Sequence, residues 1–233
     1  MKEIDIQDSS VFEEAMQAFE ENPVILIQFP EVFGLMALPN QIGVNGLNQT
    51  KNRLSGKYYG SVIGSAEKFF GMQEDYYEDL PYLKGTEDYK LLEGSILRLK
   101  ISGPELNSAA VCEGSHQSLL FKEGPIRSLF RKLEQAFEPI ADSSFYGGKV
   151  FSAPLCTSAN MSGHENGSIV DLEIAREFGK RQGIPLLIRS ESLPVPGGSF
   201  PVLYLQNKGI SVQRKGPGLE EIKARFPSEV FLH

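Results

Sequence analysis

Hydrophobic and polar residues along this chain follow the helical period in some stretches and the strand period in others. Between Pro125 and Phe137, apolar residues recur every three or four positions, and proline is favoured at the first position of a helix. Ser10 and Glu13 have the spacing of a capping box ahead of another amphipathic stretch. The pattern predicts helices at 10–21, at 44–54, from Pro125 to Phe137, at 170–182 with Asp171 or a near neighbour as the cap, and after Pro217.

Short apolar runs bounded by proline, glycine or polar residues predict the strands. Residues 24–29 read VILIQF between two prolines, which is typical of a buried strand. Residues 95–101 alternate apolar and basic side chains, which is typical of a strand with one buried face. We expect strands at 24–29, 58–64, 95–101, 185–189, 201–206 and 210–214, a turn at Gly197-Gly198, and short helices with loops at 66–91.

Helices and strands interleave along the whole chain, so the sequence predicts a layered α/β fold. The 233 residues fit one large domain or two small ones, and 41% are hydrophobic, enough for a sizeable core. Because no repeat, low-complexity tract or long linker interrupts the pattern, we expect a single domain over 1–233.

Composition excludes several classes of protein. No apolar run approaches the roughly 18 residues of a membrane helix, and the acidic start MKEIDIQDSS lacks the apolar core of an export signal. We therefore expect a cytoplasmic protein with no membrane partner. Two cysteines and three histidines, without metal-ligand spacing, predict neither a disulfide framework nor a metal site.

The charges are unevenly distributed. The net charge is −7, which argues against nucleic-acid binding by bulk charge. Yet the windows 32–66, 143–164 and 192–219 contain no Asp or Glu. If these windows meet in space, they form a positive cleft that would attract an anionic ligand. The basic residues of the three windows are Lys51, Arg53, Lys57, Lys149, Lys208, Arg214 and Lys215.

Three local patterns lie in or at these windows: Phe33-Gly34-Leu35 followed by Lys51-Asn52-Arg53, the run from Pro154 to Gly163 that contains Thr157-Ser158-Ala159-Asn160, and Arg214-Lys215-Gly216. Each has an ordinary structural explanation. A Lys-x-Arg pair is commonly a solvated helix end, and Ser and Asn commonly cap helices or form turns. However, hydroxyl, carboxamide and guanidinium groups without nearby acids also suit the binding of phosphate or carboxylate.

In this order and at this separation, the three patterns resemble the YrdC-like family of threonylcarbamoyl-AMP synthases. That family has a Tyr-Gly-Leu segment after its first core strand, a Lys-x-Arg pair soon after, a later Thr-Ser-Ala-Asn-x-Ser-Gly segment, and an Arg-x-Gly after a late strand. The resemblance covers about residues 20–65 and 150–217, and Thr157–Gly163 is its most specific part.

The resemblance implies an open, twisted mixed sheet with flanking helices and a positive concave face. It implies that L-threonine, bicarbonate and ATP form threonylcarbamoyl-AMP and pyrophosphate for the modification of tRNA, with Mg²⁺ held through the phosphates. By position, Lys51 and Arg53 would be catalytic, holding the triphosphate and stabilising charge as pyrophosphate leaves. The residues implied to bind nucleotide and substrate are Phe33, Gly34, Thr157, Ser158, Asn160 and Arg214.

The sequence departs from the family in three places. Phe33 replaces the family's tyrosine, and the Pro-Thr-acid-Thr run expected before it is absent. A Ser-Thr pair expected on the late strand is replaced by Phe200-Pro201, and residues 66–120 do not resemble the family. Two other functions therefore stay open: a non-catalytic module that binds double-stranded RNA or tRNA on the same face, and a diverged relative that binds only a nucleotide.

Overall fold

The computed structural model describes residues 1–53, 57–73, 80–83, 85–160, 167–190 and 198–232. Its strands are β1 (Lys2–Asp5), β2 (Val24–Gln28), β3 (Phe33–Ala37), β4 (Gly60–Ile63), β5 (Ser95–Lys100), β6 (Val111–Cys112), β7 (Ser115–Leu120), β8 (Leu155–Ser158), β9 (Leu186–Arg189), β10 (Val202–Gln206) and β11 (Gly209–Arg214). Its α-helices are α1 (Val11–Glu21), α2 (Gln41–Thr50), α3 (Ala66–Phe70), α4 (Pro125–Phe137), α5 (Leu172–Arg181) and α6 (Leu219–Lys223). Short 3-10 helices lie at η1 (Thr86–Leu92), η2 (Glu138–Ile140), η3 (Ser143–Tyr146) and η4 (Ser228–Val230).

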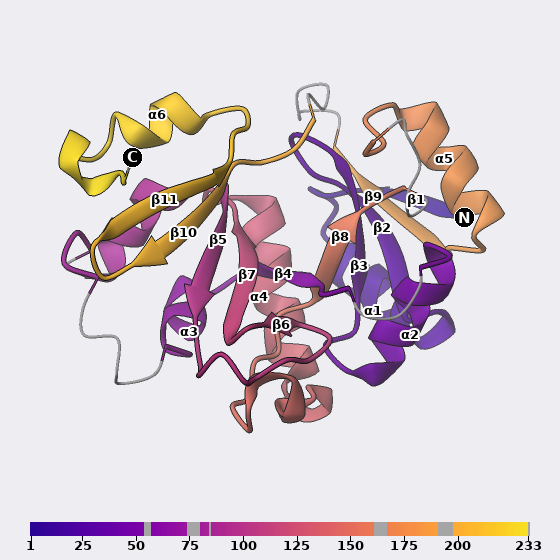
Figure 1. Ribbon diagram of the computed structural model, residues 1–233. Coiled ribbons are helices and arrows are strands. Elements are labelled where there is room, and N and C mark those ends of the chain that lie inside the picture. The colour runs from indigo at the N-terminus through magenta and orange to yellow at the C-terminus, as the bar shows by residue number, and fades with distance from the viewer. Residues whose placement is uncertain (54–56, 74–79, 84, 161–166, 191–197, 233) are drawn as a thin grey trace.

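The strands form one open, mixed sheet (Figure 1). Their order is β1-β9-β2-β3-β8-β4-β7-β5-β10-β11, with β6 added beside β7. The sheet contains parallel pairs (β1 with β9, β2 with β9, β4 with β7, β5 with β10) as well as antiparallel ones. The sheet ends at β1 and β11 and does not close on itself, which confirms the predicted fold class.

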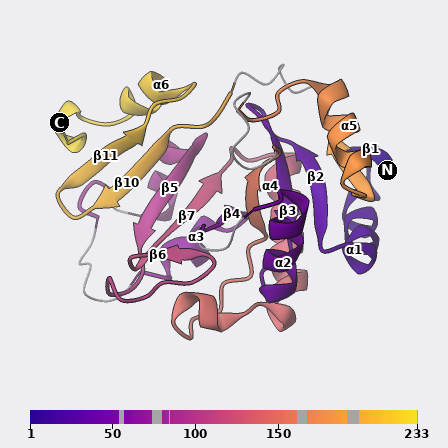
Figure 2. The same ribbon diagram turned by 45° about the vertical axis from the view of Figure 1, so that its right-hand side comes forward.

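Helices cover both faces of this sheet (Figures 1 and 2). The apolar stripes of α1 and α4 pack on one face, where Phe19 meets Phe137 edge to face with ring centroids 5.2 Å apart. On the other face, α2, α3 and α5 bury residues such as Leu47, Phe69 and Phe178. Within the described residues, no helix is long and apolar enough to cross a bilayer.

The amphipathic helices agree with their predicted positions. Pro125 opens α4, and the Asp171 carboxylate accepts a hydrogen bond from the Ile174 backbone N–H (3.0 Å), which caps α5. Two details differ. The Ser10 hydroxyl donates to Asp8 and makes no capping-box bond, and α2 ends at Thr50, so Lys51 is its cap residue. Leu54, Gly197 and the 161–163 part of the Thr-Ser-Ala-Asn segment lie outside the described residues.

Strands β1, β3, β6, β7 and β8 were not predicted. Strand β3 is apolar throughout but only five residues long, whereas β7 carries buried polar residues that interrupt its hydrophobic pattern. In β7, His116 is fully buried yet satisfied: Nδ1 donates to the Ala110 carbonyl (2.7 Å), so Nε2 accepts from the Ser61 hydroxyl (2.9 Å). The Ser61 hydroxyl also bonds that of Ser118. Burial lowers the pKa of His116 to about 4, so the ring stays neutral. A strand with buried polar residues that bond one another therefore lies in the centre of the sheet.

Candidate active site

The candidate site lies at one edge of the sheet, where three strand ends meet. Strand β8 is antiparallel to both β3 and β4, so its carboxyl end lies beside their first residues. In this register Ser158 pairs with Gly34, and Cys156 pairs with Gly60. The segment Thr157–Asn160, which the sequence singled out, thus leaves the sheet next to the end of α2.

Lys51 joins the first pattern to the second. Its Nζ donates to the Ser158 carbonyl oxygen (2.5 Å) and to the Asn160 Oδ1 (2.6 Å), and the Ser158 hydroxyl donates to the same Oδ1 (3.0 Å). Only 3% of Lys51 is exposed. This burial, helped by the positive charges of Arg53 and Lys57, lowers the pKa of Lys51 to about 7.

A tight reversal after α2 places Arg53. Asn52 adopts a left-handed backbone (φ 47°), which asparagine tolerates better than most residues, and the Arg53 N–H returns to the Asn48 carbonyl (2.9 Å). The Arg53 guanidinium then lies over the Tyr59 ring, 4.9 Å from its centroid, while the Tyr59 hydroxyl donates to Asn48 Oδ1 (2.7 Å). Within the described residues, the buried Nε of Arg53 has no hydrogen-bond partner.

These residues border a cavity of about 230 Å³, which we call the cleft. Four of the sequence-predicted residues line it: Arg53, Thr157, Ser158 and Arg214. Arg214 comes from the far part of the sheet, and its Nε and Nη2 both donate to the Phe200 carbonyl (3.2 and 3.0 Å). Burial lowers the pKa of Arg214, a guanidinium that nonetheless remains charged at neutral pH.

The other four predicted residues have different positions. Lys51 and Asn160 lie behind the lining and are linked to it by the hydrogen bonds above. Phe33 is 1% exposed and packs in the core, so its side chain does not line the cleft. Gly34 also does not line it; a Cβ there would overlap the Phe29 ring, so glycine is needed for Phe29 to reach the cleft.

Sequence reasoning missed several residues of the lining. Polar groups come from Tyr58, Gln117, Ser168 and Ser199, and apolar groups come from Ile96, Leu119 and Val202. Phe29, Val32 and Phe200, also in the lining, lie where the sequence departs from the family's threonine-bearing segments. An adjoining cavity of about 320 Å³ shares Arg53 and adds Lys57 and Arg98. The acid-free windows pointed toward this side of the molecule, but they do not all converge: Lys149 donates to the Met72 and Ile101 carbonyls, and Lys208 lines a different cavity.

The chemistry of the cleft is that of anion binding. Two guanidinium groups and several hydroxyls face a partly apolar space, and no acid is among the lining residues that the structure describes. Cys156 also lines it, but burial raises the pKa of its thiol to about 12, so it is not a thiolate nucleophile at neutral pH. Among the residues with a described position, no cluster of three His, Cys, Asp or Glu could hold a metal ion.

Neither family models nor curated proteins match this sequence, whereas solved structures match the fold. Two structures of Sua5 from P. abyssi, one a double variant and the other complexed with L-threonine, align with TM-scores of 0.69 and 0.68 at 16% identity. They cover 99% and 100% of this chain. E. coli YciO aligns with a TM-score of 0.61 at 12% identity, over 94% of this chain and 97% of its own.

The chain has the YrdC-like fold. It spans 65% and 63% of the length of the two Sua5 structures. A third protein with this fold is HypF, whose structure in a phosphate- and nucleotide-bound form aligns with a TM-score of 0.58 at 18% identity, over 87% of this chain and 28% of that one. At these identities the likeness establishes the YrdC-like fold, and activity must be argued from the cleft itself.

Proposed function

We propose that this protein is a YrdC-like nucleotide-binding enzyme that forms a carbamoyl-type adenylate. One observation carries the proposal: the Lys51 Nζ bonds both Ser158 and Asn160, so two motifs far apart in sequence form a single site beside a cleft lined by Arg53 and Arg214. That P. abyssi Sua5 was solved with L-threonine, and HypF with phosphate and nucleotide, supports this class of ligand.

The three cationic residues have different positions and therefore different proposed roles. Arg53 and Arg214 line the cleft, and their guanidinium groups can donate to phosphate oxygens. Lys51 is buried behind the cleft lining, so it would hold Ser158 and Asn160 in place and, when protonated, add positive charge behind the lining. The Ser158 side chain, which lines the cleft, can then present its hydroxyl to the nucleotide or the carbamate.

The proposed reaction needs no nucleophile from the protein. The amine of an amino acid such as L-threonine and bicarbonate give a carbamate and water. A carbamate oxygen then attacks the α-phosphorus of ATP, and the bond to the β-phosphate oxygen breaks, so that the adenylate forms and pyrophosphate leaves. Charge builds up on the phosphate oxygens, where Arg53 and Arg214 would stabilise it, with Mg²⁺ held through the phosphates. The product would serve the modification of tRNA.

The test is release of pyrophosphate from ATP with bicarbonate and a panel of amino acids. We expect turnover with at least one amino acid, and a loss of 100-fold or more, roughly, in kcat/KM for Arg53→Met, the size seen when one stabilising donor is removed. Arg181→Met, at the exposed end of α5, is the matched control and should not change turnover. No turnover with any amino acid, although AMP still stabilises the protein against heat, would favour a relative that only binds nucleotide.

One observation favours a second candidate, a non-catalytic module for double-stranded RNA or tRNA. The adjoining cavity extends the cationic surface past the cleft through Lys57 and Arg98. A helical RNA can be recognised by shape and phosphate contacts on such a surface. Salt-sensitive RNA binding that is lost in Lys57→Ala and Arg98→Ala, without pyrophosphate release, would favour this module over the enzyme.

A further inference from the structure

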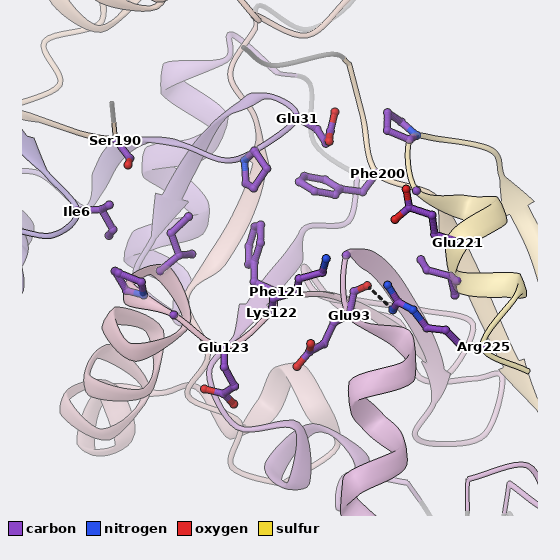
Figure 3. A pocket seen from close by; sticks show the side chains of 18 of the residues that line it. Ile6, Glu31, Glu93, Phe121, Lys122, Glu123, Ser190, Phe200, Glu221 and Arg225 are labelled. Carbon is purple, nitrogen blue, oxygen red and sulfur yellow. Dashed lines mark hydrogen bonds between the residues drawn. The ribbon is translucent and has the colours of Figure 1, made fainter. Parts of the chain in front are cut away.

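A second cavity, of about 560 Å³, lies beyond the cleft (Figure 3). It is bounded by the turn between β2 and β3, the end of β7, the first residues of α4 and the start of α6. Its apolar surface comes mainly from Phe121, Phe200, Ile126 and Ile222. Cavities of this volume with an apolar surface are typical of sites for small molecules.

A layer of aromatic rings separates this cavity from the cleft. Phe29 lines only the cleft, Phe121 lines only the second cavity, and Phe200 lines both. The rings are in contact: the centroids of Phe29 and Phe121 are 5.2 Å apart, and those of Phe121 and Phe200 are 5.6 Å apart. The second cavity is thus a space distinct from the cleft, and the two share the Phe200 ring.

Several charged residues around the second cavity already have partners. Arg127 pairs with Glu93 (2.7 Å) and with Glu123 (3.0 Å), and Glu123 also pairs with Arg131. Arg225 donates to the backbone carbonyls of Leu91 and Glu93. These contacts hold the walls of the cavity together.

Three charged side chains are available. Glu31, Glu221 and Lys122 line the cavity, and none has a hydrogen bond or ion pair to another described residue. Figure 3 shows the Glu221 carboxylate and the Lys122 ammonium directed into the cavity, with Glu31 at its edge beside Phe200. The start of α4 adds partial positive charge, since Gly124 gives its first turn no side-chain cap.

We propose that this cavity binds a small zwitterion with an apolar body, of the class of large apolar α-amino acids and short apolar peptides. An ammonium group would pair with Glu221 and Glu31, and a carboxylate would pair with Lys122 near the start of α4. The apolar part would lie against Phe121, Phe200 and Ile222. A purely cationic ligand would leave Lys122 unpaired, and a purely anionic one would face the two carboxylates.

The test measures binding of L-leucine, L-phenylalanine and the dipeptide L-leucyl-L-leucine to the full chain by calorimetry or ligand-observed NMR. We expect at least one to bind saturably below about 10 mM, the range of a weak small-molecule site. For the probe that binds, we expect the C-terminal amide, which lacks the carboxylate, and the N-acetyl form, which lacks the ammonium, each to bind at least about tenfold more weakly.

Substitutions should reproduce these losses residue by residue. Glu221→Gln should weaken binding of the zwitterion by about tenfold but leave binding of the N-acetyl form unchanged. Lys122→Gln should also weaken binding of the zwitterion by about tenfold but leave binding of the C-terminal amide unchanged. Glu220→Gln and Lys132→Gln are controls, because Glu220 precedes Glu221 on α6, Lys132 lies on α4, and neither residue lines the cavity. The proposal is overturned if none of the probes binds, if AMP displaces them, or if the control variants weaken binding as much as Glu221→Gln.

Discussion

Nucleotide affinity should fall as the pH rises above 7, because Lys51 must gain a proton to balance the phosphate charge. The ligand-free protein holds this lysine with a pKa of about 7, chiefly through burial. A neutral amine has two N–H groups, which match the two oxygens of Ser158 and Asn160 that accept from it. An anionic phosphate nearby favours the ammonium form and raises the pKa of Lys51 toward its ordinary range.

The size of the effect follows from this change in pKa. Below pH 7 the lysine is already protonated, so affinity there does not depend on it. Above pH 7 each pH unit costs about 1.4 kcal/mol, and AMP should bind about tenfold more weakly at pH 8 and about 100-fold more weakly at pH 9. The limit is the pKa of Lys51 in the complex, beyond which affinity becomes constant again.

Calorimetry with AMP at pH 8, in two buffers that differ in their heat of ionisation, measures the proton uptake directly. AMP suits the assay because its phosphate, with a second pKa of about 6, is almost fully ionised at this pH. We expect close to one proton per AMP for the natural chain and for Lys180→Met, a control on α5, and none for Lys51→Met. Constant affinity from pH 7 to 9 without proton uptake would show that Lys51 does not change its protonation state on binding, which would refute this reasoning.

Three further predictions concern the same site. Because the folded pKa of Lys51 lies below its unfolded value of 10.5, the unfolded chain binds the extra proton between pH 7 and 10.5; ligand-free stability should therefore rise with pH in that window by up to about 1.4 kcal/mol per unit relative to Lys51→Met, as denaturant unfolding would measure. Gly34→Ala should destabilise the fold by about 1–3 kcal/mol in the same assay, since its Cβ would overlap the Phe29 ring, whereas Gly85→Ala, with open space around it and no left-handed backbone, should not cause such a clash. If the enzyme is active, the ratio of kcat/KM for L-threonine over L-valine should stay below about 100, because Phe29, Val32 and Phe200 offer no hydroxyl to the substrate; strong threonine selectivity would contradict this reading of the cleft.

The sequence was most informative for segments whose own hydrophobic pattern is sufficient to predict their secondary structure. Helix α4 carries a complete apolar stripe and an N-terminal proline, and β5 alternates buried and half-buried residues, so both followed from local pattern. Strand β7 did not, because its buried polar side chains are stabilised by partners from other segments, Ser61 among them. Local periodicity cannot reveal such long-range satisfaction of polar groups.

The same distinction applies to the site. The motifs indicated that Lys51, Arg53, Ser158 and Asn160 belong together, and the structure brings them together. The ordinary explanation of Lys51 as a solvated charge at a helix end does not hold, because the side chain is buried and bonded twice. The burial of the Lys51 side chain depends on how β8 pairs with β3 and β4, and no local pattern in the sequence predicts that pairing.

The aromatic layer between the two cavities also offers a route to redesign. At Phe200 it is one side chain thick, and that ring borders both spaces. Shortening it to alanine would open a passage from the cleft into the larger cavity, while the Phe200 carbonyl that holds Arg214 would remain, because it belongs to the backbone. An engineered form could then accept amino-acid substrates whose side chains extend through the opening and are too long for the natural cleft.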